Sequence, residues 1–132
     1  MAQDVEIYVR HCSTERLLDW VASLFGEVTL TFQADDVAMT VYQCWVQGNE
    51  VRVMLIPGIE DGTFTCISFV PMQHTPWRND VECARRAARE LGSEVRCDPV
   101  AIKPMAGPPE FLRIVEGRED YVNWWAETDG DG

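Results

Sequence analysis

The chain has 132 residues and a formal net charge of −11, from 22 acidic and 11 basic residues, and Lys103 is its single lysine. Contacts to nucleic-acid phosphates and to acidic lipid surfaces need clustered Lys and Arg, so this balance excludes nucleic-acid binding and disfavours a membrane surface. The length predicts one domain, over residues 1–126, whose core needs neither a metal nor a disulfide.

Two helices are predicted from capping residues and apolar periodicity. Ser13 or Thr14 can accept a hydrogen bond from an orphan N–H at the start of the first helix, and Asn79 or Asp80 can do so for the second. In both segments apolar residues recur at helical spacing, and a glycine follows, which is typical of a helix end. The first helix should therefore end before position 26 and the second before position 92.

Strands are predicted where apolar and β-branched residues alternate or form short runs. In the middle of the chain, Gly48-Asn49 tolerates the positive φ of a tight hairpin, and Asp61-Gly62 suits a type I′ turn. These turns would join three antiparallel strands, with Pro57 limiting the ladder at the end of one of them. Residues 118–125 are expected to form a short helix or turn. The predicted strands cover residues 5–10, 28–32, 39–46, 51–56, 63–70, 94–97 and 111–115.

The resulting element order is β-α-β-β-β-β-α-β-β-α. It predicts an α+β fold in which two helices pack on one face of a largely antiparallel sheet. Residues 24–28 and 91–95 resemble each other, which allows a weak internal repeat. Residues 127–132 are acidic and glycine-rich, so they are expected to form a mobile acidic tail.

The five cysteines predict free, mostly buried thiols. Their number is odd, they are widely spaced, and no C-x-x-C motif occurs. The first residues contain neither a basic nor an apolar signal region, and no run approaches the ~20 apolar residues of a membrane helix. These observations predict a cytoplasmic protein that does not cross a membrane.

Two histidines, His11 and His74, each lie between a predicted strand and a predicted helix. In a paired βαβββ fold such positions can supply metal ligands, with Glu50 or Glu60 completing the set. That arrangement would be similar to the vicinal-oxygen-chelate enzymes, such as glyoxalases and extradiol dioxygenases. The alternative is two loop histidines that bind water, and no cofactor or metal is predicted.

Nucleophilic catalysis finds little support in the sequence. Cys12 precedes a helix start, and a lowered pKa there would need His11 or Arg10 as a basic neighbour. The alternative is a thiol at the end of a strand. Neither a G-x-S-x-G motif nor a glycine-rich phosphate loop occurs, so no catalytic residue is predicted.

Three of the five tryptophans lie in loops or at element ends. Exposed tryptophans beside charge are typical of interface hot spots, which makes Trp77 a candidate binding residue. For Trp124 and Trp125 the alternative is that they anchor the C-terminal segment to the core. Trp45 is expected in the core.

The acidic residues are concentrated in two parts of the chain. Residues 1–76 hold ten acidic and three basic residues, and residues 119–132 hold five acidic residues and no basic one. Residues 77–118 are nearly balanced, with seven acidic and eight basic residues. The concentration is consistent with ordinary acidity, or with a field that attracts a basic partner.

Three stretches, residues 76–85, 91–99 and 111–117, resemble small proteobacterial proteins for which an immunity role in polymorphic toxin systems is expected. Such systems include Rhs-type and type VI secretion effectors. The resemblance implies a cognate toxin domain as the partner and carries over no functional residue.

The charge is consistent with that role, because many toxins act on nucleic acids or nucleotides through basic active sites. Asp35, Asp36, Glu60 and Asp61, in loops of the sheet, are expected to face the toxin together with Trp77. Two alternatives are a small metal-dependent enzyme and an effector chaperone or adaptor. A homodimer formed through an exposed strand edge is a further prediction that the sequence leaves open.

Overall fold

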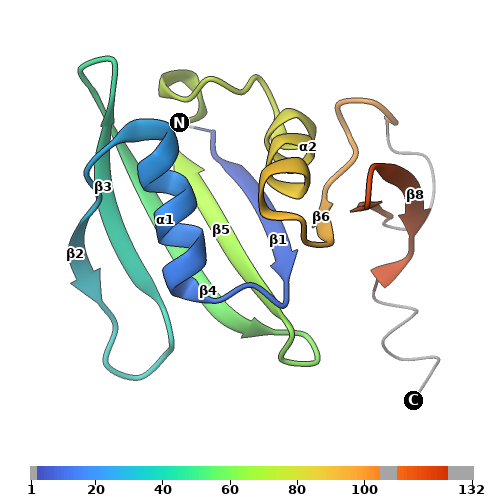
Figure 1. Ribbon diagram of the computed structural model, residues 1–132, viewed down its shortest axis with the longest axis horizontal. Coiled ribbons are helices and arrows are strands. Elements are labelled where there is room, and N and C mark those ends of the chain that lie inside the picture. The colour runs from blue at the N-terminus through green and yellow to red at the C-terminus, as the bar shows by residue number, and fades with distance from the viewer. Residues whose placement is uncertain (1–2, 105–109, 125–132) are drawn as a thin grey trace.

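Eight strands form one antiparallel sheet in the computed structural model, which describes residues 3–104 and 110–124 (Figure 1). The strand order across the sheet is β2-β3-β4-β5-β1-β6-β7-β8. The strands are β1 (Val5–Arg10), β2 (Thr29–Gln33), β3 (Thr40–Val46), β4 (Asn49–Ile59), β5 (Phe64–Val70), β6 (Val95–Cys97), β7 (Phe111–Val115) and β8 (Arg118–Val122).

Two helices, α1 (Thr14–Phe25) and α2 (Asp80–Leu91), cover one face of this sheet (Figure 1). The Ser13 hydroxyl accepts a hydrogen bond from the Arg16 N–H at 3.1 Å, and the Asn79 side chain accepts one from the Glu82 N–H at 3.0 Å. Both helices thus begin at a capped residue, as the sequence predicts. The α+β class with two helices on one sheet face is confirmed.

The main core lies between the helices and the sheet. Side chains at alternate positions of each strand point toward the helices, as period-two strands require. Val5, Ile7 and Val9 of β1 are fully buried there, and Phe69 of central strand β5 is buried with them. No helix in the described residues, including the short 3-10 helix Met72–His74, has the length and apolarity that a membrane crossing demands.

Trp124 builds a second, smaller apolar layer on the helix-free face. Its ring lies 4.6 Å from Phe64, 5.1 Å from Tyr8 and 5.0 Å from Phe111, measured between ring centroids. The residue is 4% exposed. Trp124 therefore anchors the end of the described chain to the sheet, which confirms one of the two roles considered for it.

The prediction of a short helix or turn over residues 118–125 is wrong for residues 118–122, which form a strand. Glu116 and Gly117 both have positive φ, 49° and 79°, and form a tight turn that reverses the chain after β7. Two central residues with positive φ match the twist of a hairpin. Residues 118–122 consequently pair with β7 as strand β8.

The central turns also differ in detail from the expected ones. The β3–β4 turn uses Gln47 and Gly48, with φ of 52° and 82°, and the following residue already belongs to β4. The β4–β5 connection spans residues 60–63, and positive φ occurs at Glu60 and Gly62 rather than at Asp61. That pattern is not a type I′ turn.

The chain runs twice through the order βαβββ, but the sheet positions the two halves differently. From α1 the chain crosses to the outer edge and forms β2, whereas from α2 it returns beside β1 and forms β6. The repeat is thus one of element order only. Trp125 and the acidic tail expected over residues 127–132 lie outside the described residues.

Candidate protein-binding surface

Strand β2 is one edge of the sheet and carries no charged residue. Its sequence is Thr-Leu-Thr-Phe-Gln, and all five residues are exposed. Within the described residues its only neighbouring strand is β3. Leu30 is 51% and Phe32 52% exposed, on opposite faces of the sheet. An uncharged, exposed edge strand with apolar side chains can pair with a strand of another chain, and proteins usually prevent such pairing with charged residues.

The loop after β2 carries the first predicted pair of acidic residues. Asp35 and Asp36 are exposed, and Val37 beside them is 57% exposed. A hydrogen bond from the Ala34 N–H to the Met39 carbonyl, at 3.1 Å, closes the base of this loop. Among the ion pairs between described residues, none involves Asp35 or Asp36, so their charges remain directed to solvent.

The second predicted pair lies in the β4–β5 loop. Asp61 accepts hydrogen bonds from the N–H and the hydroxyl of Thr63, at 3.0 and 2.6 Å. These bonds, with Arg10 at 3.7 Å, hold the pKa of the exposed Asp61 carboxyl below its usual value. Glu60 precedes it with a φ of 61°. The Asp61 charge is thus partly balanced within the chain, unlike that of Asp35.

The two acidic loops lie at the same end of the sheet but on different hairpins (Figure 1). One joins β2 to β3 and the other joins β4 to β5. The strands that enter both loops, β2 and β4, run in the same direction, because β3 is antiparallel to each of them. The four predicted acidic residues therefore share one end of the molecule without forming a single cluster.

Trp77 does not belong to an exposed surface, and this expectation is wrong. It is 5% exposed and stacks on Trp20 with ring centroids 6.1 Å apart. Phe69 and Phe25 lie at 5.0 and 5.8 Å from the same ring. The segment before α2 carries the ring between α1 and the sheet, where its large apolar area is buried.

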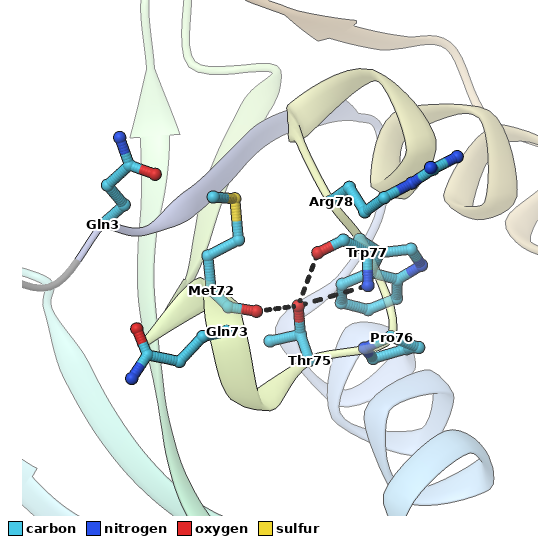
Figure 2. Close-up of a pocket in the computed structure, with 7 residues that line it drawn as sticks. All are labelled: Gln3, Met72, Gln73, Thr75, Pro76, Trp77 and Arg78. Carbon is cyan, nitrogen blue, oxygen red and sulfur yellow. Dashed lines mark hydrogen bonds between the residues drawn. The ribbon is translucent and has the colours of Figure 1, made fainter.

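A surface pocket of about 530 Å³ lies beside this tryptophan (Figure 2). The Thr75 hydroxyl donates to the Met72 carbonyl at 2.7 Å and accepts from the Trp77 N–H at 3.3 Å, which fixes the pocket wall. Among the described residues that line it, Arg78 is the only one with an ionisable side chain. None of the described residues that line it is a His, Cys, Asp or Glu. Its lining consists of Gln3, Met72, Gln73, Thr75, Pro76, Trp77 and Arg78.

Trp45 was expected in the core, but it is 55% exposed on the helix-free face. It pairs across the hairpin with Glu50, whose carboxylate accepts a hydrogen bond from the Gln43 amide at 2.7 Å. The alternation along β3 decides its position, because Tyr42 and Cys44 face the helices. The sequence signal that was missed is Glu50, which lies opposite Trp45 across the hairpin. Directly opposed residues share a face of the sheet, and a glutamate is almost never fully buried.

The two histidines do not form a shared site. His11 follows β1 and His74 follows β5, and these strands are antiparallel, so the histidines lie at opposite ends of the sheet. The His74 ring nitrogen Nδ1 lies 3.0 Å from the backbone carbonyl of Glu50. Within residues 3–104 and 110–124, no group of three His, Cys, Asp or Glu side chains is arranged to hold a metal ion.

The thiols are not activated nucleophiles. Burial raises the pKa of Cys12, so the low pKa considered for it is wrong. On the helix-free face, burial raises the pKa of the Cys66 thiol to about 12. The Tyr8 hydroxyl donates to Glu6 at 2.5 Å, and burial raises the pKa of Tyr8 above its ordinary range. All three groups stay protonated at neutral pH.

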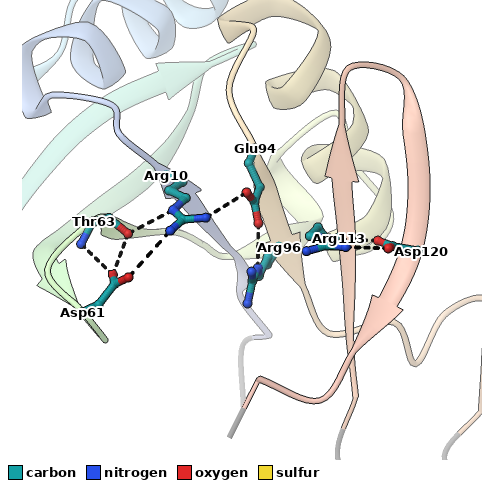
Figure 3. A network of polar contacts seen from close by, with 7 residues as sticks. All are labelled: Arg10, Asp61, Thr63, Glu94, Arg96, Arg113 and Asp120. Carbon is teal, nitrogen blue, oxygen red and sulfur yellow. Dashed lines mark hydrogen bonds and ion pairs between the residues drawn. The ribbon is translucent and has the colours of Figure 1, made fainter. Parts of the chain in front are cut away.

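A network of ion pairs holds the strands near β1 together (Figure 3). Glu94 accepts hydrogen bonds from Arg10 at 3.3 Å and from Arg96 at 2.9 Å. The Arg96 guanidinium is buried between the rings of Phe64 and Trp124, at 5.0 and 4.9 Å. Arg10 and Arg96 therefore form ion pairs within the fold, beside the central strand β1.

Comparisons with protein-family models, curated proteins and solved structures give no match. The candidate protein-binding surface is therefore defined by its own chemistry. Its members are an uncharged strand edge, exposed apolar side chains and two unbalanced aspartates. Sequence reasoning found the aspartates but missed Leu30 and Phe32, because a strand in the interior of a sheet and one at its edge can share the same apolar pattern.

Proposed function

We propose that this chain is an immunity protein of a polymorphic toxin system, such as one with Rhs-type or type VI secretion effectors. It binds a secreted antibacterial toxin in the cytoplasm of the producing cell. It neutralises the toxin by covering a basic active site with its own acidic surface.

One observation carries the proposal: the segment of the chain that contains β2 carries charge of a single sign, and Arg52, the cation two strands away on β4, pairs with Glu50 at 3.6 Å. Residues 17–51 hold five acidic residues and no Lys, Arg or His. Asp35 and Asp36 are exposed within this region, next to the exposed Val37 and Phe32. Charges of one sign accelerate the encounter with an oppositely charged protein, and apolar residues beside them provide contact area.

The metal-dependent enzyme is disfavoured, because the histidines it requires lie at opposite ends of the sheet. An effector chaperone remains the alternative that experiment must separate. A chaperone would stabilise its effector and leave the effector's activity intact, whereas an immunity protein abolishes that activity.

The test has two steps. This chain, used as bait at low salt, should recover one basic protein domain from a lysate of the producing cells, and high salt should release it. That domain should kill a sensitive strain when expressed alone, and co-expression of this chain should restore growth. A recovered domain that is not toxic, or whose toxicity persists under co-expression, would contradict the immunity role.

Charge reversal then tests the surface. In the variant Asp35→Lys/Asp36→Lys, we expect the association rate at low salt to fall by about tenfold or more, with a smaller change in the dissociation rate. The matched control, Glu15→Lys/Glu116→Lys, changes the net charge equally at exposed positions outside residues 17–51. Equal effects of the two variants would assign the attraction to net charge alone. The pair Glu60→Lys/Asp61→Lys measures the contribution of the second loop.

A further inference from the structure

We infer that β2 binds its partner by strand addition, and that the added strand belongs to a basic protein and carries Lys or Arg at both of its ends. The inference deepens the proposed function, on which it rests for the identity of the partner as a toxin. The occupant is defined by its chemistry: an extended segment that pairs backbone groups with β2.

The two edges of the sheet differ in a way that selects β2. At the other edge, β8 carries Arg118, Glu119 and Asp120, and both of its acidic residues are paired. Asp120 binds Arg113 at 2.6 Å, and Glu119 binds Arg85 at 2.8 Å. Charged edge residues discourage strand addition. The β2 edge, at the opposite side of the sheet in Figure 1, has no such protection.

A bulge divides the β2 edge into two short stretches. The register with β3 shifts between Leu30 and Phe32, and the Thr31 hydroxyl donates to the Val41 carbonyl at 3.1 Å. A bulge twists an edge and shortens the ladder that a neighbour can form. An added strand therefore pairs over only a few residues, and side chains at its ends must supply much of the affinity.

The charges at the ends of β2 decide which strand fits. Glu27 precedes the strand, and Asp35 and Asp36 follow it, all of them exposed. Two copies of this chain paired antiparallel through β2 would place the aspartates of one beside the glutamate of the other. Parallel pairing would bring the aspartates together. Both arrangements repel, whereas a strand with basic ends is attracted at each end.

Exposed side chains give such a strand two faces to contact. Leu30 is directed to the face that the helices cover, and Phe32 to the helix-free face. In strand addition, alternate side chains of the added strand supply the specificity. A partner strand with apolar residues between its basic ends would contact both side chains.

The experiment uses defined peptides, so it does not depend on the toxin. The basic probe is Lys-Lys-Val-Thr-Val-Thr-Val-Lys-Lys, and its matched control has Glu at the four lysine positions. At low salt we expect the basic peptide to slow hydrogen exchange of the amides of residues 29–33 by about tenfold or more, and the acidic peptide to leave it unchanged.

Two aromatic-to-lysine variants at the two edges complete the test. Phe32→Lys, at a position 52% exposed on β2, should weaken binding of the basic peptide by about tenfold. Tyr121→Lys, at a position 42% exposed on β8, should leave it unchanged. Amide spectra of both variants must match those of the parent.

Strand addition would be overturned if the basic peptide does not protect the amides of residues 29–33, or if both peptides protect them equally. It would also be overturned if the peptide changes only the amides of the acidic loops. If sedimentation shows a dimer of this chain and hydrogen exchange shows protected β2 amides without peptide, the edge binds a second copy. That result would also overturn strand addition by a basic partner. If co-expression restores growth but the peptide does not protect the β2 amides, the immunity role stands and strand addition is wrong. If the peptide protects the β2 amides but co-expression does not restore growth, strand addition stands and the immunity role is wrong.

Discussion

Replacing Trp77 and Trp45 by alanine, one at a time, tests the most consequential difference between the structure and the sequence pattern. The pattern predicts an exposed Trp77 and a buried Trp45, and the structure has the reverse, with 5% and 55% of each residue exposed. The two variants remove the same atoms. Any difference in the free energy of unfolding therefore reports the surroundings of the ring.

The expected magnitudes follow from those surroundings. Trp77 contacts three aromatic rings, and truncating a buried tryptophan costs roughly 3–5 kcal/mol. Within the described residues its indole N–H has no hydrogen-bond partner, and removing a buried unpaired donor returns about 1 kcal/mol or more. We therefore expect a loss of about 3 kcal/mol for Trp77→Ala and about 1 kcal/mol for Trp45→Ala.

Urea denaturation followed by far-ultraviolet circular dichroism measures both losses. With a slope of roughly 1–3 kcal/mol per molar urea, Trp77→Ala should lower the midpoint by about 1–3 M, and Trp45→Ala by less than about 1 M. Trp77→Phe, which keeps a ring and deletes the unpaired N–H, should cost less than half as much as Trp77→Ala. Equal losses for the two alanine variants, or a larger loss for Trp45→Ala, would refute the placement of both rings.

Three further predictions concern stability and thiol chemistry. Burial raises the pKa of Asp80, which accepts a hydrogen bond from the Glu6 N–H at 3.1 Å, to about 6. The native state thus holds this proton more tightly than the unfolded state, so the associated stability is complete below about pH 4 and is lost as the pH rises through about 6. This loss amounts to about 1 kcal/mol after allowance for solvent screening. It should disappear in the variant Asp80→Asn when denaturation curves are measured between pH 4 and 7.5. An unchanged pH dependence in the variant would contradict the assignment. Asn79→Ala removes the cap of α2 and should cost about 1 kcal/mol in thermal unfolding, whereas Asn79→Ser should cost clearly less. All five cysteines are buried, so a disulfide reagent such as dithiobis-nitrobenzoate should label no thiol within minutes in the native protein and five after unfolding, and a fast-reacting native thiol would show that one of them is accessible.

Local signals in the sequence determined the helices and most strands. Ser13 and Asn79 cap the helices because their side chains bond the nearby N–H groups of residues 16 and 82, an interaction within one turn of the chain. The alternation in Val5–Arg10 likewise fixes which side chains share a face. The helix expected after residue 117 failed for a local reason as well, because the positive φ of Glu116 was not expected.

The candidate binding surface could be predicted from the sequence only in part. Asp35 and Asp36 follow a strand in the sequence, and acidic residues in a loop are exposed in most folds. Leu30 and Phe32 would be covered if another strand lay on the outer side of β2. The sequence of β2 itself does not indicate whether such a strand is present. The sequence also shows no difference between the two loops, although Arg10 balances Asp61 and leaves Asp35 unbalanced.

The sequence by itself determined the acidity, the helix boundaries and the alternation of the strands, because these depend on composition and on contacts between residues close in the chain. Only the tertiary structure decided that β2 is an edge, that Trp77 is buried and Trp45 exposed, and that the two histidines lie apart. Each of these depends on which strands become neighbours. That choice is set by packing between segments distant in sequence, where a single chain gives no local signal.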